Sequence, residues 1–150
     1  KISVITLPQT NLFLQGRQHP TATPRGLTPI TVLRDAGVTV AAGADNVQDP
    51  FNLVGRSDPL ETASLLVMAG HQTPTEAYQL VSENPRSVLG IHPSKIHTGS
   101  IADLVAIDTP SVRSAIADAP FSRRVYRHGL LVASTDQKSH IGYENQKFSR

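Results

Sequence analysis

An aspartate just after a continuous apolar segment is the residue best placed to do chemistry in this chain. Asp45 follows Val38–Gly43, a glycine-bounded run typical of a strand buried on both faces of a parallel sheet. In parallel β/α architectures, ligands and catalytic groups gather at the carboxyl ends of the strands. A carboxylate there can ligate a metal ion or accept the proton of a water molecule that a metal activates. The alternative is that Asp45 and Asn46 simply form an Asx turn.

The six histidines do not supply the remaining ligands of such a metal site. Metal-binding histidines usually come as a His-x-His pair or as positions i and i+4 of a helix. His92 and His97 are the nearest pair, and both fall in a connection that contains Pro, Ser and Gly. The chain has no cysteine, which excludes disulfides, thiolate zinc sites and cysteine nucleophiles. Any metal must therefore be held by His, Asp or Glu, and Asp45 alone does not make a site.

Composition excludes several classes of protein. The 150 residues include 39% hydrophobic and 17% charged side chains, as expected for a soluble globular chain. A net charge of only +2 and an aromatic content of 5% argue against nucleic acid as a partner. No apolar run approaches the roughly 20 residues that a membrane span needs. We therefore expect a cytoplasmic protein with neither a nucleic-acid nor a membrane partner.

Two strands and a series of helices would position Asp45. The patterns of Ile2–Thr6 and Asn11–Leu14 predict one interrupted buried strand, and the composition of Gln15–Leu27 predicts a loop. A short helix ended by Gly37 then precedes the strand Val38–Gly43. Three further helices each open with a capping residue and a proline, at Asp58-Pro59, Thr73-Pro74 and Asn84-Pro85.

The pattern changes after about residue 90, where short strands replace helices. Leu104–Asp108 reads as a strand, and Val112–Ala117 as one or two helical turns. The segments on either side of His128-Gly129 predict a β-hairpin. The chain therefore divides into a β/α part and a smaller β part.

The order of these motifs resembles the seventh and eighth strand regions of cytosine deaminase-like enzymes in the metal-dependent amidohydrolase superfamily. The resemblance rests on Leu12–Arg17, Arg25–Pro29 and Leu33–Phe51. Gly99–Val105 and Arg124–Val132 are similar to the strands that return the C-terminus of that superfamily to a small β-sandwich.

This resemblance implies an α/β fold, the C-terminal part of a (β/α)8 TIM barrel, with its last two strands and following helices plus strands of a small β-sandwich. The resemblance runs over Ser3–Ala133. Residues 1–90 would be the barrel part, 91–133 the returning β-sandwich segment and 134–150 a polar C-terminal tail. A closed barrel needs about 250 residues. We therefore expect the C-terminal portion of a longer enzyme, with Lys1 marking a cut just ahead of strand seven.

By the same resemblance, Asp45 contacts one catalytic divalent metal ion, zinc or iron, and takes part in proton transfer from the attacking water. Asn46 stands where cytosine deaminases commonly carry a second acidic residue near the substrate ring, and this departure puts cytosine itself in doubt. Phe51 lies where the family places a large aromatic residue on the loop over the pocket. Gln15 either faces the cavity or has a purely structural role. The other metal ligands and the proton-shuttling glutamate belong to strands outside this chain.

The implied activity is hydrolytic deamination of a nitrogen heterocycle. Activated water would attack the ring carbon that carries the exocyclic amine, and ammonia would leave from a tetrahedral intermediate. One alternative is cleavage of another C–N bond, in an N-alkylamino-triazine or a cyclic amide. Another is a non-catalytic fragment that needs a partner segment. The expected partners are a small heterocyclic substrate and the N-terminal barrel segment of the same enzyme, and a homo-oligomer stays open.

Overall fold

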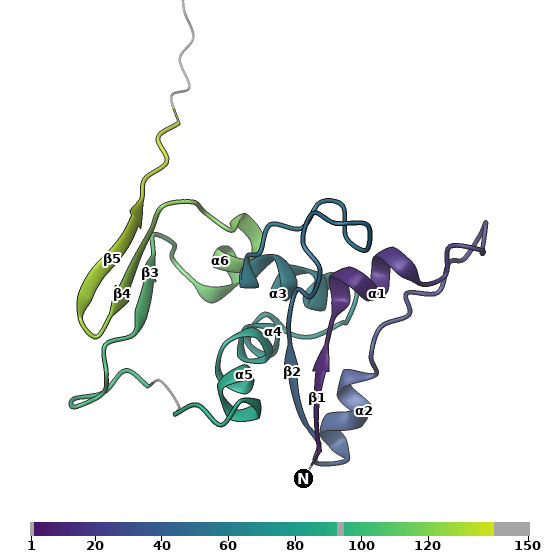
Figure 1. Cartoon of the computed structure of the whole chain (residues 1–150), viewed down its shortest axis with the longest axis horizontal. Coiled ribbons are helices and arrows are strands. Elements are labelled where there is room, and N and C mark those ends of the chain that lie inside the picture. Colours follow the sequence, from purple (N-terminus) through teal and green to yellow (C-terminus); the bar gives the residue numbers. More distant parts are fainter. Residues whose placement is uncertain (1, 93–94, 140–150) are drawn as a thin grey trace, which may run out of the picture.

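A helix-rich part built around two parallel strands and a three-stranded antiparallel sheet make up the structure (Figure 1). The computed structural model describes residues 2–92 and 95–139. In chain order the elements are β1 (Ser3–Thr6), α1 (Pro8–Leu14), α2 (Ile30–Asp35), β2 (Thr39–Ala42), α3 (Pro59–Met68), α4 (Pro74–Val81), α5 (Glu83–Val88), β3 (Leu104–Ile107), α6 (Val112–Asp118), β4 (Arg123–Arg127) and β5 (Leu130–Thr135).

The parallel pairing of β1 with β2 confirms the expectation drawn from the apolar run at residues 38–43. Thr6 lies opposite Ala42 in the register, and the Gly43 N–H extends the pairing by donating to the Thr6 carbonyl at 3.0 Å. Val40 and Ala41 are only 1% and 0% exposed. The carboxyl ends of both strands therefore meet at one edge, the upper one in Figure 1.

The prediction that Asn11–Leu14 continues the first strand is wrong, because these residues form the second half of α1. Pro8 opens the helix directly after β1, since its fixed φ suits a first turn whose N–H groups have no helical partner. The Asn11 N–H then donates to the Leu7 carbonyl at 3.0 Å. The chain therefore turns away at the strand end, and α1 lies at the carboxyl edge of the sheet (Figure 1).

The helix-capping predictions are confirmed for α3 and α4. The Asp58 side chain accepts the Leu60 N–H at 3.0 Å at the start of α3. Thr73 and Glu76 exchange hydrogen bonds in a capping box at the start of α4. Gly37, with φ +76°, follows the end of α2 as expected.

The expected start of α5 at Asn84-Pro85 is wrong, because that helix begins at Glu83 and no side chain caps it. Asn84 has a different role. Its Nδ2 donates to the Val40 carbonyl at 2.7 Å, which ties α5 to the buried strand β2. A tertiary hydrogen bond has therefore replaced the local cap that the sequence suggested.

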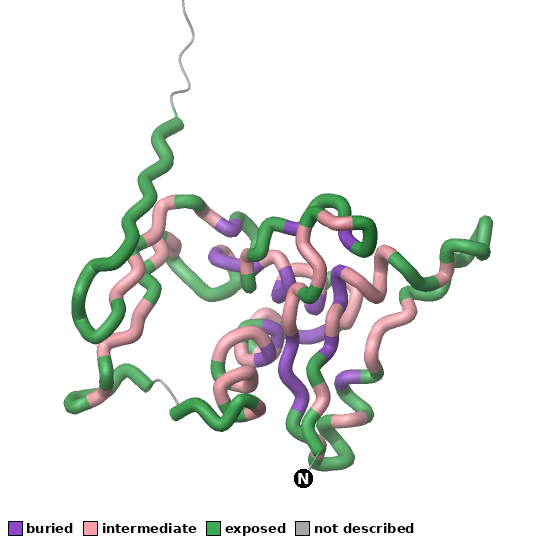
Figure 2. Tube along the Cα trace, viewed as in Figure 1, coloured by how far each residue is buried: buried purple, intermediate pink, exposed green. Residues whose placement is uncertain are grey.

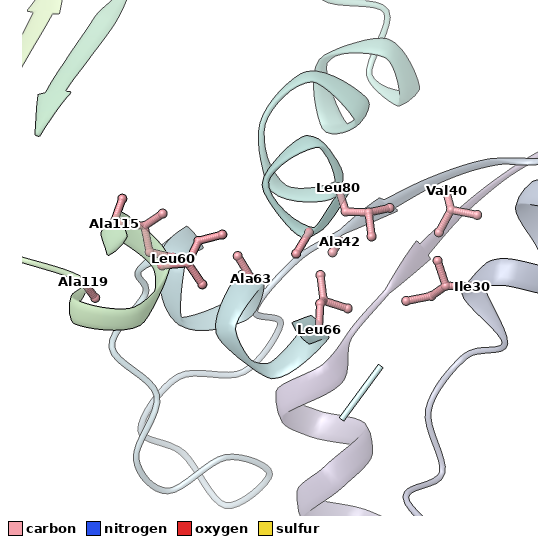
Figure 3. Close-up of a cluster of buried hydrophobic side chains, with 11 residues drawn as sticks. Ile30, Val40, Ala42, Leu60, Ala63, Leu66, Leu80, Ala115 and Ala119 are labelled. Carbon is pink, nitrogen blue, oxygen red and sulfur yellow. The ribbon is translucent and has the colours of Figure 1, made fainter. Parts of the chain in front are cut away.

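The hydrophobic core lies between β2 and the helices that cover it, and Figure 2 shows the buried trace concentrated there. Leu66 of α3 and Leu80 of α4 are 0% and 1% exposed, and both pack in the same cluster as Val40 (Figure 3). The other buried members of the cluster are Ile30, Ala42, Leu60, Ala63, Ala77, Ala115, Ile116 and Ala119.

Helix α6 joins this core although it lies within the segment 91–133 that we expected to be a separate β part. Ala115 and Ile116 of α6 are buried, and the helix packs against α3 and α4. The strands β3, β4 and β5 form the antiparallel sheet on the other side of α6, in that order. The β4–β5 hairpin is confirmed, with His128 and Gly129 both at positive φ in its turn.

Strand β5 is exposed at all of its six residues. Leu130, Leu131 and Val132 present 71%, 54% and 57% of their surface. No helix within the described ranges is long and apolar enough to cross a lipid bilayer.

The position of Leu66 predicts a large cost for shortening its side chain. Leu66→Ala should lower the free energy of unfolding of the full chain by about 2–5 kcal/mol, because it leaves a cavity at the centre of the core. Met68→Ala in the same helix is the matched control, since Met68 is 66% exposed. Urea denaturation should show a shift for the first variant and a change within about 0.5 kcal/mol for the second. Equal shifts would contradict this placement of the core.

Candidate functional site

The carboxylate of Asp45 lies at the carboxyl edge of the two parallel strands, just beyond β2. Its backbone is in the left-handed region, with φ +59°, a conformation that Asp and Asn tolerate better than most residues. The residue is exposed. Within residues 2–92 and 95–139 no hydrogen bond to its side chain is present. The structure therefore leaves this carboxylate available for an external ligand.

Residues 43–57, here called the Asp45 loop, are held by an internal network centred on Asp49. Asp49 Oδ1 accepts the N–H groups of Phe51 and Asn52 at 2.8 and 3.1 Å, and Oδ2 accepts the Asn46 side-chain amide. Asn52 is 5% exposed, and its Nδ2 donates to the Asn46 carbonyl at 2.7 Å. The Asx turn of this loop is therefore formed by Asp49, and not by Asp45 and Asn46 as in the alternative interpretation.

The environment of Asp49 favours its charged form. Desolvation raises the pKa of this carboxyl, but the hydrogen bonds from the Asn46 side chain and from two backbone N–H groups outweigh it. The net effect lowers the pKa of Asp49 below its ordinary value of 3.8. The ionised carboxylate therefore holds the loop in shape at neutral pH.

The loop closes on itself around Gly55. A Cβ built at Gly55 would lie 2.6 Å from Asn52 Nδ2, so only glycine fits there without a shift. Gln48 Nε2 donates to the Gly55 carbonyl at 3.1 Å. At the end of the loop, Glu61 of α3 accepts the Arg56 N–H at 2.8 Å. The loop is therefore a packed unit with one end on β2 and the other on α3.

Phe51 and Gln15, the two other predicted site residues, lie in different surroundings. Phe51 is on the Asp45 loop with 53% of its surface exposed. Gln15 is exposed at the end of α1, and its side chain packs against Gly26, where a Cβ would collide with it. The structure therefore brings Asp45, Asn46 and Phe51 together on one loop. Its contacts with Gly26 give Gln15 a structural role in the segment after α1, and a role toward substrate stays a prediction.

The described residues contain no group of three or more His, Cys, Asp or Glu side chains that could hold a metal ion. His92 and His97, the nearest pair in the sequence, are both exposed, and the His97 ring bonds to the adjacent Thr98 carbonyl at 2.9 Å. In the described part of the chain, Asp45 is thus the single predicted metal ligand.

Two side-chain contacts that join α1 and the segment after it to α3 have only weak signals in the sequence. Arg25 Nη1 donates to the Ala69 carbonyl at 2.9 Å and contacts the His71 ring, which ties the segment after α1 to the C-terminus of α3. Gln9 of α1, 7% exposed, donates to Thr62 Oγ1 of α3 at 2.7 Å. Asp49 had a usable signal, because Asp-Pro at a loop centre favours a turn.

Comparison with known proteins decides the family. Residues 1–133 match the Amidohydrolase family. The chain belongs to this family. The resemblance read from the sequence motifs to the amidohydrolase superfamily and its deaminases is therefore confirmed.

Two curated relatives of this amidohydrolase chain are deaminases. It is 36% identical over 138 residues to a pterin deaminase of Rhizobium rhizogenes, covering 87% of this chain and 31% of the relative. It is 29% identical over 142 residues to a 5-methylthioadenosine/S-adenosylhomocysteine deaminase of Halobacterium salinarum, covering 90% and 29%. The chain thus spans about a third of the length of these relatives.

Solved structures share the fold of this amidohydrolase chain. A 5-methylcytosine deaminase of Klebsiella pneumoniae liganded with 5-fluorocytosine aligns with a TM-score of 0.77 at 23% identity, over 95% of this chain and 35% of the other. An N-isopropylammelide isopropylaminohydrolase of Burkholderia multivorans aligns with a TM-score of 0.65 at 29% identity, over 77% and 30%. The mixed α/β arrangement is therefore that of a portion of the amidohydrolase fold.

The lowered pKa of Asp49 predicts an acid-dependent effect of removing its charge. Such a carboxyl stabilises the fold above its unfolded pKa of about 3.9, and this contribution is lost as the pH falls through the lower folded value. Asp49→Asn should therefore lower the urea midpoint of the full chain at pH 7, and the two midpoints should converge below about pH 4.

The control for this prediction is Asp136→Asn, which removes the same charge from an exposed position after β5. It should leave the urea midpoint nearly unchanged at pH 7. A difference between wild type and Asp49→Asn that stays constant from pH 7 to pH 3 would contradict the assigned network.

Proposed function

We propose that this amidohydrolase chain is the C-terminal portion of a metal-dependent hydrolase that releases the exocyclic amine of a nitrogen heterocycle as ammonia. The observation that carries the proposal is the exposed Asp45 carboxylate. It stands at the carboxyl edge of two parallel strands and has no hydrogen bond from the described residues. The deaminase relatives support the same reaction.

In this proposal β1 and β2 are the last two strands of a (β/α)8 barrel, and residues 91–133 return to a small β-sandwich. Two features support it. Among the described residues β1 pairs only with β2, so its other edge is open for a further strand. The chain also covers about a third of the solved amidohydrolases that it resembles. An N-terminal barrel segment of the same enzyme would complete the site.

The donor set of this chain fits one ligand position of a divalent metal, zinc or iron. Asp45 is a carboxylate with no competing partner in the described residues, and the remaining ligands would come from outside this chain. When bound, such a metal lowers the pKa of a coordinated water and polarises the substrate. Asp45 would contribute one oxygen to the metal and accept the proton of the attacking water.

The other residues of the Asp45 loop would shape the pocket. The Asn46 amide is fixed by Asp49 and stays neutral across the working pH range, so it can orient a ring by hydrogen bonding without supplying charge. The exposed Phe51 ring offers an apolar face for a planar heterocycle. A pterin fits both features and is the substrate class of the relative that is 36% identical. Gln15 would line the entrance of this pocket only if its side chain moved away from Gly26.

Cleavage of an alkylamino C–N bond is the second candidate. The 29% identity with the N-isopropylammelide isopropylaminohydrolase favours it, together with the neutral Asn46. The two reactions differ in the leaving group, which is ammonia in one and an alkylamine in the other.

The first test removes the charge of Asp45 without changing its backbone preference. Asn tolerates the same left-handed conformation as Asp, so Asp45→Asn in the complete enzyme should fold normally. We expect kcat for ammonia release to fall by about 10²–10⁴-fold, because a proton acceptor is lost, and metal content to decrease. Asp35→Asn is the matched control at an exposed position. Wild-type turnover by Asp45→Asn would overturn the assignment.

The second test identifies the leaving group. The complete enzyme is incubated with a pterin, cytosine and N-isopropylammelide, and ammonia and isopropylamine are quantified separately. We expect ammonia from the pterin and no isopropylamine. Release of isopropylamine alone would favour the second candidate. An inactive complete enzyme that binds no metal would instead favour a non-catalytic role.

A further inference from the structure

Arg123 of β4 forms a two-pronged ion pair with the residue at which the Asp45 loop ends and α3 begins. Its Nη2 donates to Asp58 Oδ2 at 2.7 Å, and its Nη1 donates to Asp58 Oδ1 at 3.2 Å. Its Nε donates to the Pro120 carbonyl at 2.7 Å, so the guanidinium is itself held in place. This paired geometry is the strong form of an arginine–carboxylate contact.

The burial of this pair separates it from the other ion pairs of the described residues. The side chains of Arg123 and Asp58 are 22% and 15% exposed. Arg34 and Glu76 are each 36% exposed, so water screens that pair more strongly. Removing one partner of a half-buried pair leaves a poorly hydrated charge, which makes the contact costly to break.

Asp58 has two tasks at once. Its Oδ1 accepts the Leu60 N–H as the cap of α3, and both of its oxygens bind Arg123. Desolvation raises the pKa of Asp58, but the Arg123 hydrogen bonds, the Leu60 N–H and nearby positive charge outweigh it and lower the pKa. A charged Asp58 therefore joins the start of α3 to β4 at neutral pH.

The ion pair also lies at the C-terminal end of the Asp45 loop, because Asp58 directly follows residue 57. The other end of the loop is fixed where Gly43 bonds to Thr6, and Asp49 and Gly55 hold its interior. A loop that is rigid inside moves as a unit, so its orientation depends on its two ends. One end belongs to the parallel strands. The other end is joined to α3, where Glu61 accepts the Arg56 N–H and Arg123 binds the cap residue Asp58.

A cavity of about 410 Å³ borders the pair. Its lining combines Asp58 and Arg123 with apolar side chains of α3, α4 and β3, among them Leu60, Val81 and Ile107. Side-chain packing on this side of α3 is therefore incomplete.

We propose that Arg123 is a positioning residue, which orients the Asp45 loop by holding Asp58 to the antiparallel sheet. This inference rests on the proposed function for its catalytic consequence, because the group it positions is the Asp45 carboxylate. It gives the antiparallel sheet a role in the reaction although none of its residues would touch the substrate. Small displacements of a catalytic group are costly, with losses of about 10²-fold for a shift of about 1 Å.

The test compares two arginines that are adjacent in β4. Arg123→Met removes the ion pair, whereas Arg124→Met removes the same charge from an exposed side chain that has no ion pair within the described ranges. Hydrogen exchange of the complete enzyme is measured by mass spectrometry. We expect at least about tenfold faster exchange in peptides of residues 44–57 for Arg123→Met alone, with α4 and the β4–β5 hairpin unchanged.

Two further variants keep the test decisive. Asp58→Asn retains an oxygen for the Leu60 N–H but loses the carboxylate, so it should reproduce the exchange pattern of Arg123→Met. The double variant should be no worse than either single one, because both remove the same contact. If Arg123→Met does not fold, Arg123→Lys takes its place, because it keeps the charge but loses the paired hydrogen bonds. Its exchange in residues 44–57 should then lie between that of the wild type and that of Asp58→Asn.

Activity provides the second measurement. We expect kcat/KM to fall by about 10–100-fold in Arg123→Met and in Asp58→Asn, and to stay at the wild-type value in Arg124→Met. Unchanged exchange in residues 44–57, or strictly additive effects of the two single variants, would overturn the role of Arg123. The exchange measurement needs no turnover, so an inactive wild-type enzyme would contradict the proposed function while the test of Arg123 still stands.

Discussion

Parallel pairing of β1 with β2 is the constraint on which the rest of the structure depends. Parallel strands require a long crossover, here α1, the segment after it and α2, and they place both carboxyl ends at one edge. The buried strand β2 then needs cover from α2, α4 and α5 because its backbone and side chains lie inside the core. Asp45 reaches the surface at that edge because the chain must leave β2 there.

Helix α3 converts this arrangement into a defined loop. Its first turn accepts backbone and side-chain donors from Arg56, Leu60 and Arg123, and its centre carries the buried contact between Thr62 and Gln9 of α1. The same helix supplies Leu66 to the core. Core packing and loop geometry are therefore coupled through one helix. A change that tilts α3 would also shift the Asp45 loop.

The sequence predicts the features whose causes are local. The apolar run of β2, the caps at Asp58 and Thr73 and the hairpin turn at His128 and Gly129 each follow from neighbouring residues. The prediction of a strand at residues 11–14 failed because the apolar run at residues 12–14 is compatible with a strand and with a helix. The proline at the start of α1 decides for the helix. Asn84 and Arg123 bond to groups far away in the chain. No spacing rule reveals such partners. The place of Asp45 after the apolar run of β2 singled it out, whereas motif resemblance alone singled out Asn46 and Phe51 from other loop residues.

The seating of α6 in the core sets limits on recombination between related amidohydrolases. Ala115, Ile116 and Ala119 pack with residues of α3, although they come after the antiparallel sheet has begun. A chimera joined in the connection near residue 90 would pack α6 of one parent against α3 of the other. Crossovers that keep α3, α6 and β4 from one parent would preserve both the shared core and the Arg123–Asp58 ion pair. The residues that must be exchanged together in this chain are therefore those that contact one another, and they are not contiguous in the sequence.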